Sequence, residues 1–170
     1  MKKMKPYLLT PKNFNQLKDE VKKNSSKKSE IFSSSSKNVE RDKQLIFASN
    51  DDELNRKVLE KLPIQLLLIE LSGRKDFQKQ RNSGFNHVLA KIAKKNNVSI
   101  GIDLDELINS ENKPEILARI IQNIKICNKN KIQMKFVSKK YSKNIYDLKS
   151  LGLILGMPTS MIKNLELIKL

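Results

Sequence analysis

The sequence predicts an α/β fold of the TIM-like (β/α) barrel type, with parallel strands. From Gln44 onward, short apolar runs typical of strands alternate with longer segments in which apolar residues recur at helical spacing. This alternation is typical of βαβ units and a parallel sheet. The sequence contains no Gly-rich phosphate loop, so a dinucleotide-binding fold has no motif in its support. Because about six or seven strand candidates are present, against the eight of a full barrel, we expect an open or slightly incomplete barrel.

The first predicted pair of elements is a strand at 44–49 and a helix at 50–61. QLIFAS is a short apolar run, and Asn50 or Asp51 can cap the helix that follows. Pro63 ends that helix, and the near-continuous apolar run IQLLLIEL (64–71) predicts a strand covered on both faces. The residues expected on the buried face of the helix are Leu54, Val58 and Leu62.

The alternation continues to the C-terminus. We expect strands at 98–102 and 133–138 and helices after residue 84, from Pro114 to residue 130, and at 144–156. Pro158 and Thr159 open a last short helix, and the Gly152 and Gly156 pair indicates close helix packing. In the helix after residue 84, we expect four residues to face the core: Phe85, Val88, Leu89 and Ile92. In the helix that begins at Pro114, we expect the core-facing residues to be Ile116, Leu117, Ile120, Ile121 and Ile124.

The N-terminal part has a different composition. Residues 1–5 form a basic tail, and 6–170 are expected to form a single (β/α)-barrel domain. Residues 22–43 are rich in Ser and Lys, and we expect only a short strand at Glu30–Phe32 within them.

Charge gives the first functional indication. The chain has 34 Lys and Arg against 18 Asp and Glu, a formal net charge of +16. An excess of this size favours an anionic partner, and nucleic acid is the first candidate because its phosphates concentrate negative charge. An anionic membrane surface is the second, and a lysine-rich composition without functional meaning is the third interpretation. The apolar run Leu66–Ile69 is too short to span a bilayer, so no membrane role is expected.

Cys127 and His87 are the only residues of their types. A structural zinc site needs about four such ligands, and a lone cysteine makes no intramolecular disulfide, which favours a reducing, cytoplasmic compartment. We expect Cys127 in the core. His87 cannot form the histidine cluster of a metal-dependent phosphoesterase. It is expected to bond nearby backbone at a helix start, or to contact RNA beside helix N–H groups that favour phosphate.

A carboxylate group follows the strand at 98–102. Asp103, Asp105 and Glu106 are compatible with a magnesium site. Because few other carboxylates follow strands, the favoured interpretation is that Asp103 or Asp105 caps a short turn.

Basic residues gather after two predicted strands. Arg74, Lys75, Lys79 and Arg81 follow one strand. Lys139, Lys140 and Lys143 follow another, and Lys91, Lys94 and Lys95 lie on the polar side of a helix. In a barrel the loops after the strands open on the same face, so these residues are expected to converge. With aromatic residues at 5%, phosphate and shape recognition of folded RNA fits better than stacking on bases.

Three blocks resemble a known family. GFNHVLAKIAKKNNVSIGI, LARIIQNIKICNKNKI and YDLKSLGLILGM are similar, in this order, to blocks of the archaeal and eukaryotic ribonuclease P protein component 3. The resemblance covers Gly84 to the C-terminus and reaches more weakly back to about Ser29. It implies a TIM-like barrel related to PHP phosphoesterases.

The resemblance also implies a function. It is that of a ribonuclease P subunit, which supports the catalytic RNA in removing the 5′ leader of precursor tRNA. The partners would be ribonuclease P RNA, precursor tRNA, component 2 and other ribonuclease P proteins. Magnesium is expected in the holoenzyme, while no cofactor, metal or catalytic residue is assigned to this chain. The expected RNA-binding residues are Arg74, Lys75, Arg81, His87, Lys91, Lys95, Arg119, Lys139 and Lys140.

The family usually has a strand and a helix before the position of Tyr7, and without them the barrel is expected to be incomplete at its N-terminus. The chain also departs from the family pattern in its loops. FQKQRNS is inserted before Gly84, so either Arg74 or Arg81 can fill the family's loop Arg position. Asp105 stands where many members have Arg. The alternatives are a degenerate PHP-type metal-dependent phosphoesterase and a stand-alone basic RNA-binding barrel. The single histidine argues against the first, and the ordered blocks argue against the second.

Overall fold

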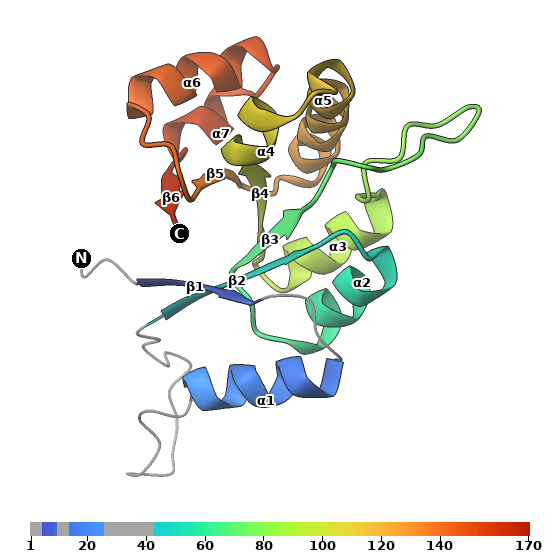
Figure 1. Ribbon diagram of the computed structural model, residues 1–170, viewed down its shortest axis with the longest axis vertical. Coiled ribbons are helices and arrows are strands. Elements are labelled where there is room, and N and C mark those ends of the chain that lie inside the picture. The colour runs from blue at the N-terminus through green and yellow to red at the C-terminus, as the bar shows by residue number, and fades with distance from the viewer. Residues whose placement is uncertain (1–4, 10–13, 26–42) are drawn as a thin grey trace.

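The computed structural model describes residues 5–9, 14–25 and 43–170, and strands and helices alternate along most of them (Figure 1). The strands are β1 (Lys5–Leu9), β2 (Lys43–Ser49), β3 (Leu66–Ile69), β4 (Ser99–Asp103), β5 (Met134–Ser138) and β6 (Leu167–Lys169). The helices are α1 (Phe14–Ser25), α2 (Asp52–Lys61), α3 (His87–Lys95), α4 (Leu104–Asn109), α5 (Lys113–Asn130), α6 (Ile145–Ile154) and α7 (Thr159–Lys163).

The strands form one parallel sheet. Its order β1-β2-β3-β4-β5-β6 follows the chain, and every neighbouring pair is parallel. A sheet that grows by one neighbour at each step curls into a barrel, as in (β/α) folds. Among the described residues β1 and β6 remain the edges of this sheet, so the barrel is nearly closed but open between them. The predicted TIM-like α/β fold, with fewer than eight strands, is confirmed.

The core has two layers because the strands are buried on both faces. Phe47 and Leu67 point to the large layer between sheet and helices, whereas Ile46 and Leu68 belong to a smaller cluster on the inner face. Gly101 of β4 also faces inward, where a Cβ would lie 2.7 Å from Leu68 Cδ1. The barrel interior is therefore filled by side chains and has no room for a larger residue at this position.

Side-chain caps set the start of several helices. The carboxylate of Asp51 accepts from the N–H groups of Glu53 and Leu54 and begins α2, so Asp51 rather than Asn50 is the cap. Asn86 caps α3 in the same way. The helix predicted to contain Phe85 therefore starts later, at His87, and Val88 is 55% exposed instead of facing the core.

The C-terminal helix pair confirms one glycine prediction and corrects the other. A Cβ on Gly152 would lie 2.7 Å from Ile162 Cδ1, so its lack of a side chain lets α6 pack on α7. Gly156 lies beyond the end of α6, with φ of +89°. It serves the turn into α7, because such a backbone conformation is open mainly to glycine, and a Cβ at this position would meet no atom within 4 Å.

Among the described residues, β1, α1, α4 and β6 are missing from the sequence-based prediction, and α1 reaches into the stretch 22–43 where the sequence predicts only a short strand. β1 contains Pro6, α4 has six residues and β6 has three, so none carries a clear period. The strand predicted at Glu30–Phe32 and residues 1–4 of the predicted tail lie outside the described residues. Cys127 is a core residue as predicted, and its burial raises the pKa of the thiol to about 12.

Candidate nucleic-acid interface

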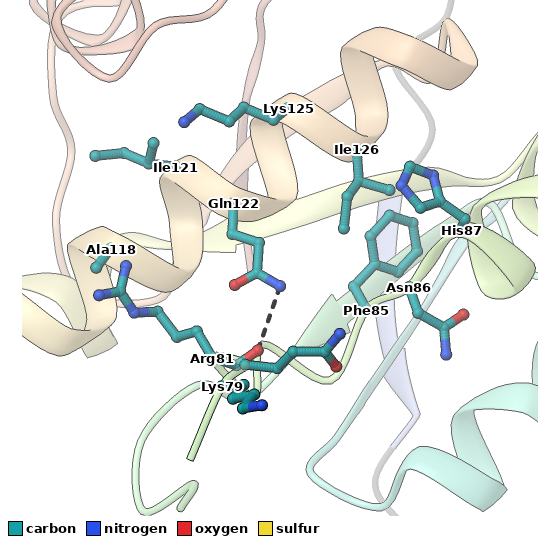
Figure 2. A pocket seen from close by; sticks show the side chains of 11 residues that line it. Lys79, Arg81, Phe85, Asn86, His87, Ala118, Ile121, Gln122, Lys125 and Ile126 are labelled. Atoms are coloured by element: carbon teal, nitrogen blue, oxygen red, sulfur yellow. Dashed lines mark hydrogen bonds between the residues drawn. The ribbon is translucent and has the colours of Figure 1, made fainter. Parts of the chain in front are cut away.

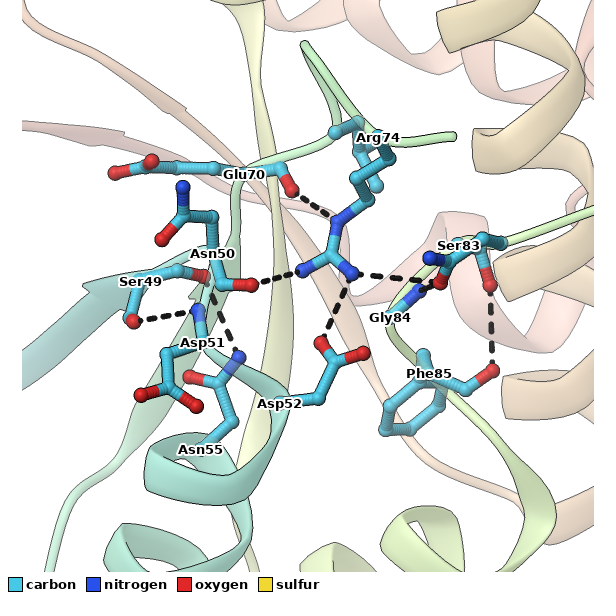
Figure 3. A network of polar contacts seen from close by, with 12 residues as sticks. Ser49, Asn50, Asp51, Asp52, Asn55, Glu70, Arg74, Ser83, Gly84 and Phe85 are labelled. Carbon is cyan, nitrogen blue, oxygen red and sulfur yellow. Dashed lines mark hydrogen bonds and ion pairs between the residues drawn. The ribbon is translucent and has the colours of Figure 1, made fainter. Parts of the chain in front are cut away.

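Arg74 fixes the start of the long loop between β3 and α3, residues 72–86 (Figure 3). Its Nε donates to the carbonyl oxygen of Glu70 at 2.6 Å, and its terminal nitrogens donate to Asp52 Oδ1 at 2.9 Å and to the carbonyl oxygen of Asn50 at 3.0 Å. Only 6% of the Arg74 side chain is exposed. The guanidinium therefore joins the ends of β2 and β3 to the start of α2, and it is not free to meet a phosphate.

Gly84 closes the same loop over Arg74. Its φ is +66°, and a Cβ would lie 2.4 Å from Arg74 Cζ, so both backbone and space require glycine. The side-chain oxygen of Asn82 accepts from the N–H of Gly84 at 3.2 Å and from Arg74 at 3.5 Å. The first and last parts of the loop are therefore held together by one guanidinium.

Arg119 holds the loop from the side of α5. It is 2% exposed, and it donates to the carbonyl oxygens of Leu71 at 3.0 Å and Arg74 at 2.8 Å and to Asp76 Oδ1 at 3.0 Å. The N–H of Asn82, and then Arg119, hold the pKa of Asp76 below its ordinary value. Arg119 was predicted to bind RNA, but its donors are turned to the protein interior.

A groove lies between this loop, the start of α3 and α5 (Figure 2). Its volume is about 530 Å³. Figure 2 shows Arg81 and Ala118 at one end and His87 and Ile126 at the other, with Gln122 donating to the carbonyl oxygen of Arg81 at 3.3 Å between them. The residues that line it are Lys79, Gln80, Arg81, Phe85, Asn86, His87, Ala118, Ile121, Gln122, Lys125 and Ile126.

The charge of the groove has one sign. Lys79, Arg81 and Lys125 line it, whereas no carboxylate does. Within the described part of the chain Lys79 and Lys125 have no ion-pair partner, and Arg81 has only a long contact of 3.9 Å with Asp76, which already pairs with Arg119. Exposed cations without counter-charges make this groove suited to an anionic ligand.

His87 is the first residue of α3 and is exposed. Its Nδ1 lies 3.5 Å from the side-chain nitrogen of Asn130, which itself donates to the carbonyl oxygen of Ile126 at 2.8 Å. The cap of α3 comes from Asn86, so the imidazole is not used by the helix start and faces the groove instead.

The second basic loop, residues 139–144 between β5 and α6, is organised by Asp105. Its carboxylate accepts from the N–H groups of Lys139 and Lys140 and from the Ser138 hydroxyl at 2.9 Å. Burial would raise the pKa of Asp105, but these hydrogen bonds outweigh it and lower the pKa. Tyr141 donates from its hydroxyl to Asn109, which adds a second tie to α4.

The neighbouring carboxylates are engaged by backbone in a similar way. Asp103 caps α4, as the favoured interpretation predicts, and burial raises its pKa. Glu106 accepts from the N–H groups of Leu71 and Ser72. In residues 5–9, 14–25 and 43–170 no three His, Cys, Asp or Glu side chains come close enough to hold a metal ion.

The predicted basic residues do not all converge. Figure 1 shows loop 72–86 extending past α3 and α5, while the β5–α6 segment lies beside α6 on the other side of the view. Lys75 is exposed on loop 72–86 but does not line the groove, and Lys91 and Lys95 are exposed on α3 outside it. The structure therefore brings Arg81 and His87 of the predicted set into the groove, whereas Lys139 and Lys140 lie on the β5–α6 loop, which Asp105 of α4 holds.

Two groove residues, Gln122 and Lys125, were missed in the sequence because α5 looked like a buried helix. They follow Ala118 at i+4 and i+7, which places all three on one helical stripe beside the core-facing one. Arg119 lies three residues after Ile116, on the buried stripe itself. Helical spacing therefore contained the signal that Lys125 rather than Arg119 is exposed.

Comparisons with known proteins bear on the fold. No family model matches the chain, and no similar protein was found among curated sequences. One similar solved structure is a chain in the cryo-EM structure of archaeal ribonuclease P with mature tRNA, with a TM-score of 0.71 at 23% identity. The two share their fold. The match covers 93% of this chain and 62% of that chain, so the chain spans less than two thirds of its structural neighbour.

In the described residues, no helix has the length and apolar character needed to cross a membrane.

Proposed function

We propose that this chain is a protein subunit of ribonuclease P, which binds the catalytic RNA and a partner protein subunit and so supports removal of the 5′ leader from precursor tRNA. The observation that carries the proposal is the fold shared with a chain of archaeal ribonuclease P over 93% of this chain. That chain comes from an assembly solved with mature tRNA, and the groove described above offers cations to such an anionic partner.

The residues that carry the family resemblance support the same conclusion. Gly84 belongs to the first block and Arg119 to the second, and both fix loop 72–86 through Arg74. A sequence that keeps these residues keeps the shape of the loop that presents Arg81 and His87. Two of the three resembling blocks therefore contribute to one physical unit, the wall of the groove.

The role we propose is electrostatic. A folded RNA brings phosphates together, and lysine and arginine side chains offset their repulsion and release counterions. Hydrolysis of the phosphodiester, with magnesium, belongs in this proposal to the RNA of the holoenzyme. This chain contributes affinity and RNA stabilisation, and component 2 is the protein partner that the resemblance implies, in a cytoplasmic particle.

Reconstitution tests the proposal. Cleavage of precursor tRNA is measured with ribonuclease P RNA and the remaining protein subunits, with and without this chain, over a magnesium titration. Omission is expected to raise the magnesium concentration needed for half-maximal cleavage, whereas an oligolysine of equal charge should not restore it. Identical titration curves with and without the chain would refute the proposal.

The chain alone gives the second test. Purified and free of RNA, it is expected to leave precursor tRNA and simple phosphoesters intact at any magnesium or manganese concentration. Activity that survives purification and disappears in His87→Ala would return the phosphoesterase interpretation.

A further inference from the structure

The groove has a floor as well as a charged rim. Phe85 and Ile126 are buried beneath it, at 3% and 8% exposure, and Ala118 and Ile121 of α5 are half-buried along its wall. The cationic groups stand around these apolar side chains (Figure 2). The ligand that fits must therefore offer both negative charge and an apolar face.

A base-paired RNA does not offer that combination. In a duplex the faces of the bases are stacked on each other, and a protein meets phosphates and 2′-hydroxyl groups. Phosphate binding alone needs only the cations and leaves the half-buried apolar side chains of Ala118 and Ile121 unused. An unpaired nucleotide presents a flat apolar base directly beside its phosphate.

We propose that this groove holds one unpaired nucleotide of the bound RNA, with its base against Ile121 and Ala118 and its phosphates at Lys79, Arg81 and Lys125. This inference rests on the proposed function, since it names the form of RNA that the groove selects. His87 and Asn86 stand at the far end from Ala118, so the RNA chain leaves the groove past them in this proposal.

The test compares two RNA hairpins of equal charge, one fully paired and one in which one nucleotide of the stem is unpaired as a bulge. Binding is measured by fluorescence anisotropy over a range of potassium chloride concentrations. The intact protein is expected to bind the bulged hairpin about fivefold more tightly, which corresponds to about 1 kcal/mol. Equal affinity for both hairpins overturns the inference, and the proposed function stands if both bind.

Two substitutions separate rim from floor. Ile121→Ser is expected to remove the preference for the bulged hairpin and leave the salt dependence unchanged. Lys125→Gln is expected to lower affinity and to reduce the slope of log K against log salt by about 0.7, as for one single-strand phosphate contact. Lys129→Gln, the same change one turn further along α5 and outside the groove, is the control and should do neither.

A cross-linking measurement keeps the result independent of the stability of any variant. A 4-thiouridine at the bulge of the hairpin is expected to cross-link to α5 between Ala118 and Ile126 or to residues 79–87. A cross-link confined to other segments overturns the inference. Failure of the intact protein to bind either hairpin instead contradicts the proposed function itself.

Discussion

At the residue scale, the two buried arginines show why residue type alone is a poor guide to which side chains bind RNA. Arg74 and Arg119 belong to the basic set that predicts RNA binding, yet both donate to main-chain carbonyl oxygens at the ends of strands. The planar guanidinium has several donors in a fixed fork, so it can satisfy two or three buried acceptors at once. The lysine ammonium has three donors, but all of them sit on one nitrogen and cannot reach acceptors as far apart as those of a guanidinium. An arginine next to a glycine-containing loop is therefore better interpreted as a residue whose hydrogen bonds tie the loop to the strand ends.

Gly84→Ala tests this tie. The new Cβ would collide with the Arg74 guanidinium at a backbone conformation with φ of +66°, so the substitution should lower the free energy of unfolding by about 2–4 kcal/mol. Urea denaturation followed by circular dichroism gives the value. Gly73→Ala is the control: φ is +68° but nothing lies within 4 Å of a Cβ, so only the backbone cost of about 1–2 kcal/mol remains. Equal losses in both variants would contradict the tie.

Asp105 and Asp103 predict opposite pH dependences. The pKa of Asp105 is lowered in the folded protein, so its hydrogen bonds to Lys139, Lys140 and Ser138 stabilise the fold above the unfolded-state pKa, and this contribution is lost as pH falls. Asp105→Asn should therefore destabilise the protein at pH 7, with a deficit that shrinks toward pH 3. The pKa of Asp103 is raised, so its charged form is the less favoured one in the fold.

Asp103→Asn supplies the contrast, because asparagine caps a helix about as well as aspartate. It should leave stability at pH 7 equal or slightly higher, with its advantage falling as pH drops below the folded-state pKa. Thermal unfolding at pH 3, 5 and 7 measures both variants. The same pH trend in both would mean that the two carboxylates do not differ as described.

At the scale of elements, the sequence predicts the clear apolar runs and stripes and misses α1 of the N-terminal part as well as two short elements. The apolar runs at β2, β3 and β5 and the stripe of α5 carry clear periods, so the parallel order follows from them. Elements of three to six residues, β6 and α4, give no period to detect. The groove could not be predicted from the sequence for another reason. Its shape depends on how loop 72–86 packs against α5, and the hydrogen bonds of Arg119 that set this packing leave no local sequence pattern.

Arg119→Lys should loosen that loop while keeping the charge. It removes donors from two main-chain carbonyl oxygens and Asp76, a loss of about 2 kcal/mol in local stability. Amide hydrogen exchange within 72–86 and trypsin cleavage after Lys75, Lys79 and Arg81 should accelerate, while β4 and β5 stay protected. Arg56→Lys, an exposed arginine paired with Glu60 on α2, is the matched control. Unchanged loop protection in Arg119→Lys would mean that the loop is held by other contacts.

The whole molecule carries a net charge of +16, which disfavours a compact state by self-repulsion until an anionic partner binds. Two groups of exposed basic residues follow from the structure: the groove with Lys79, Arg81 and Lys125, and the β5–α6 loop with Lys139, Lys140 and Lys143. The first has an apolar floor and no carboxylate. The second is a backbone turn held by Asp105, with its lysine side chains exposed. Only the first offers more than charge.

Salt dependence decides whether charge or its arrangement matters. Replacing the three groove cations by Gln should reduce the slope of log K against log salt by about two to three units, since each phosphate contact contributes roughly 0.7 to 0.9. The equivalent triple change in the β5–α6 loop should add a further reduction if one RNA spans both surfaces. All substitutions are exposed, so each should change stability by no more than about 0.5 kcal/mol.

The control replaces Lys113, Lys129 and Lys163, exposed lysines outside both surfaces. If this control flattens the slope as much as the groove variant, only net charge matters and an organised RNA surface is excluded. If the groove variant alone also raises the magnesium requirement of the reconstituted particle, the groove is the part of this chain that holds the RNA.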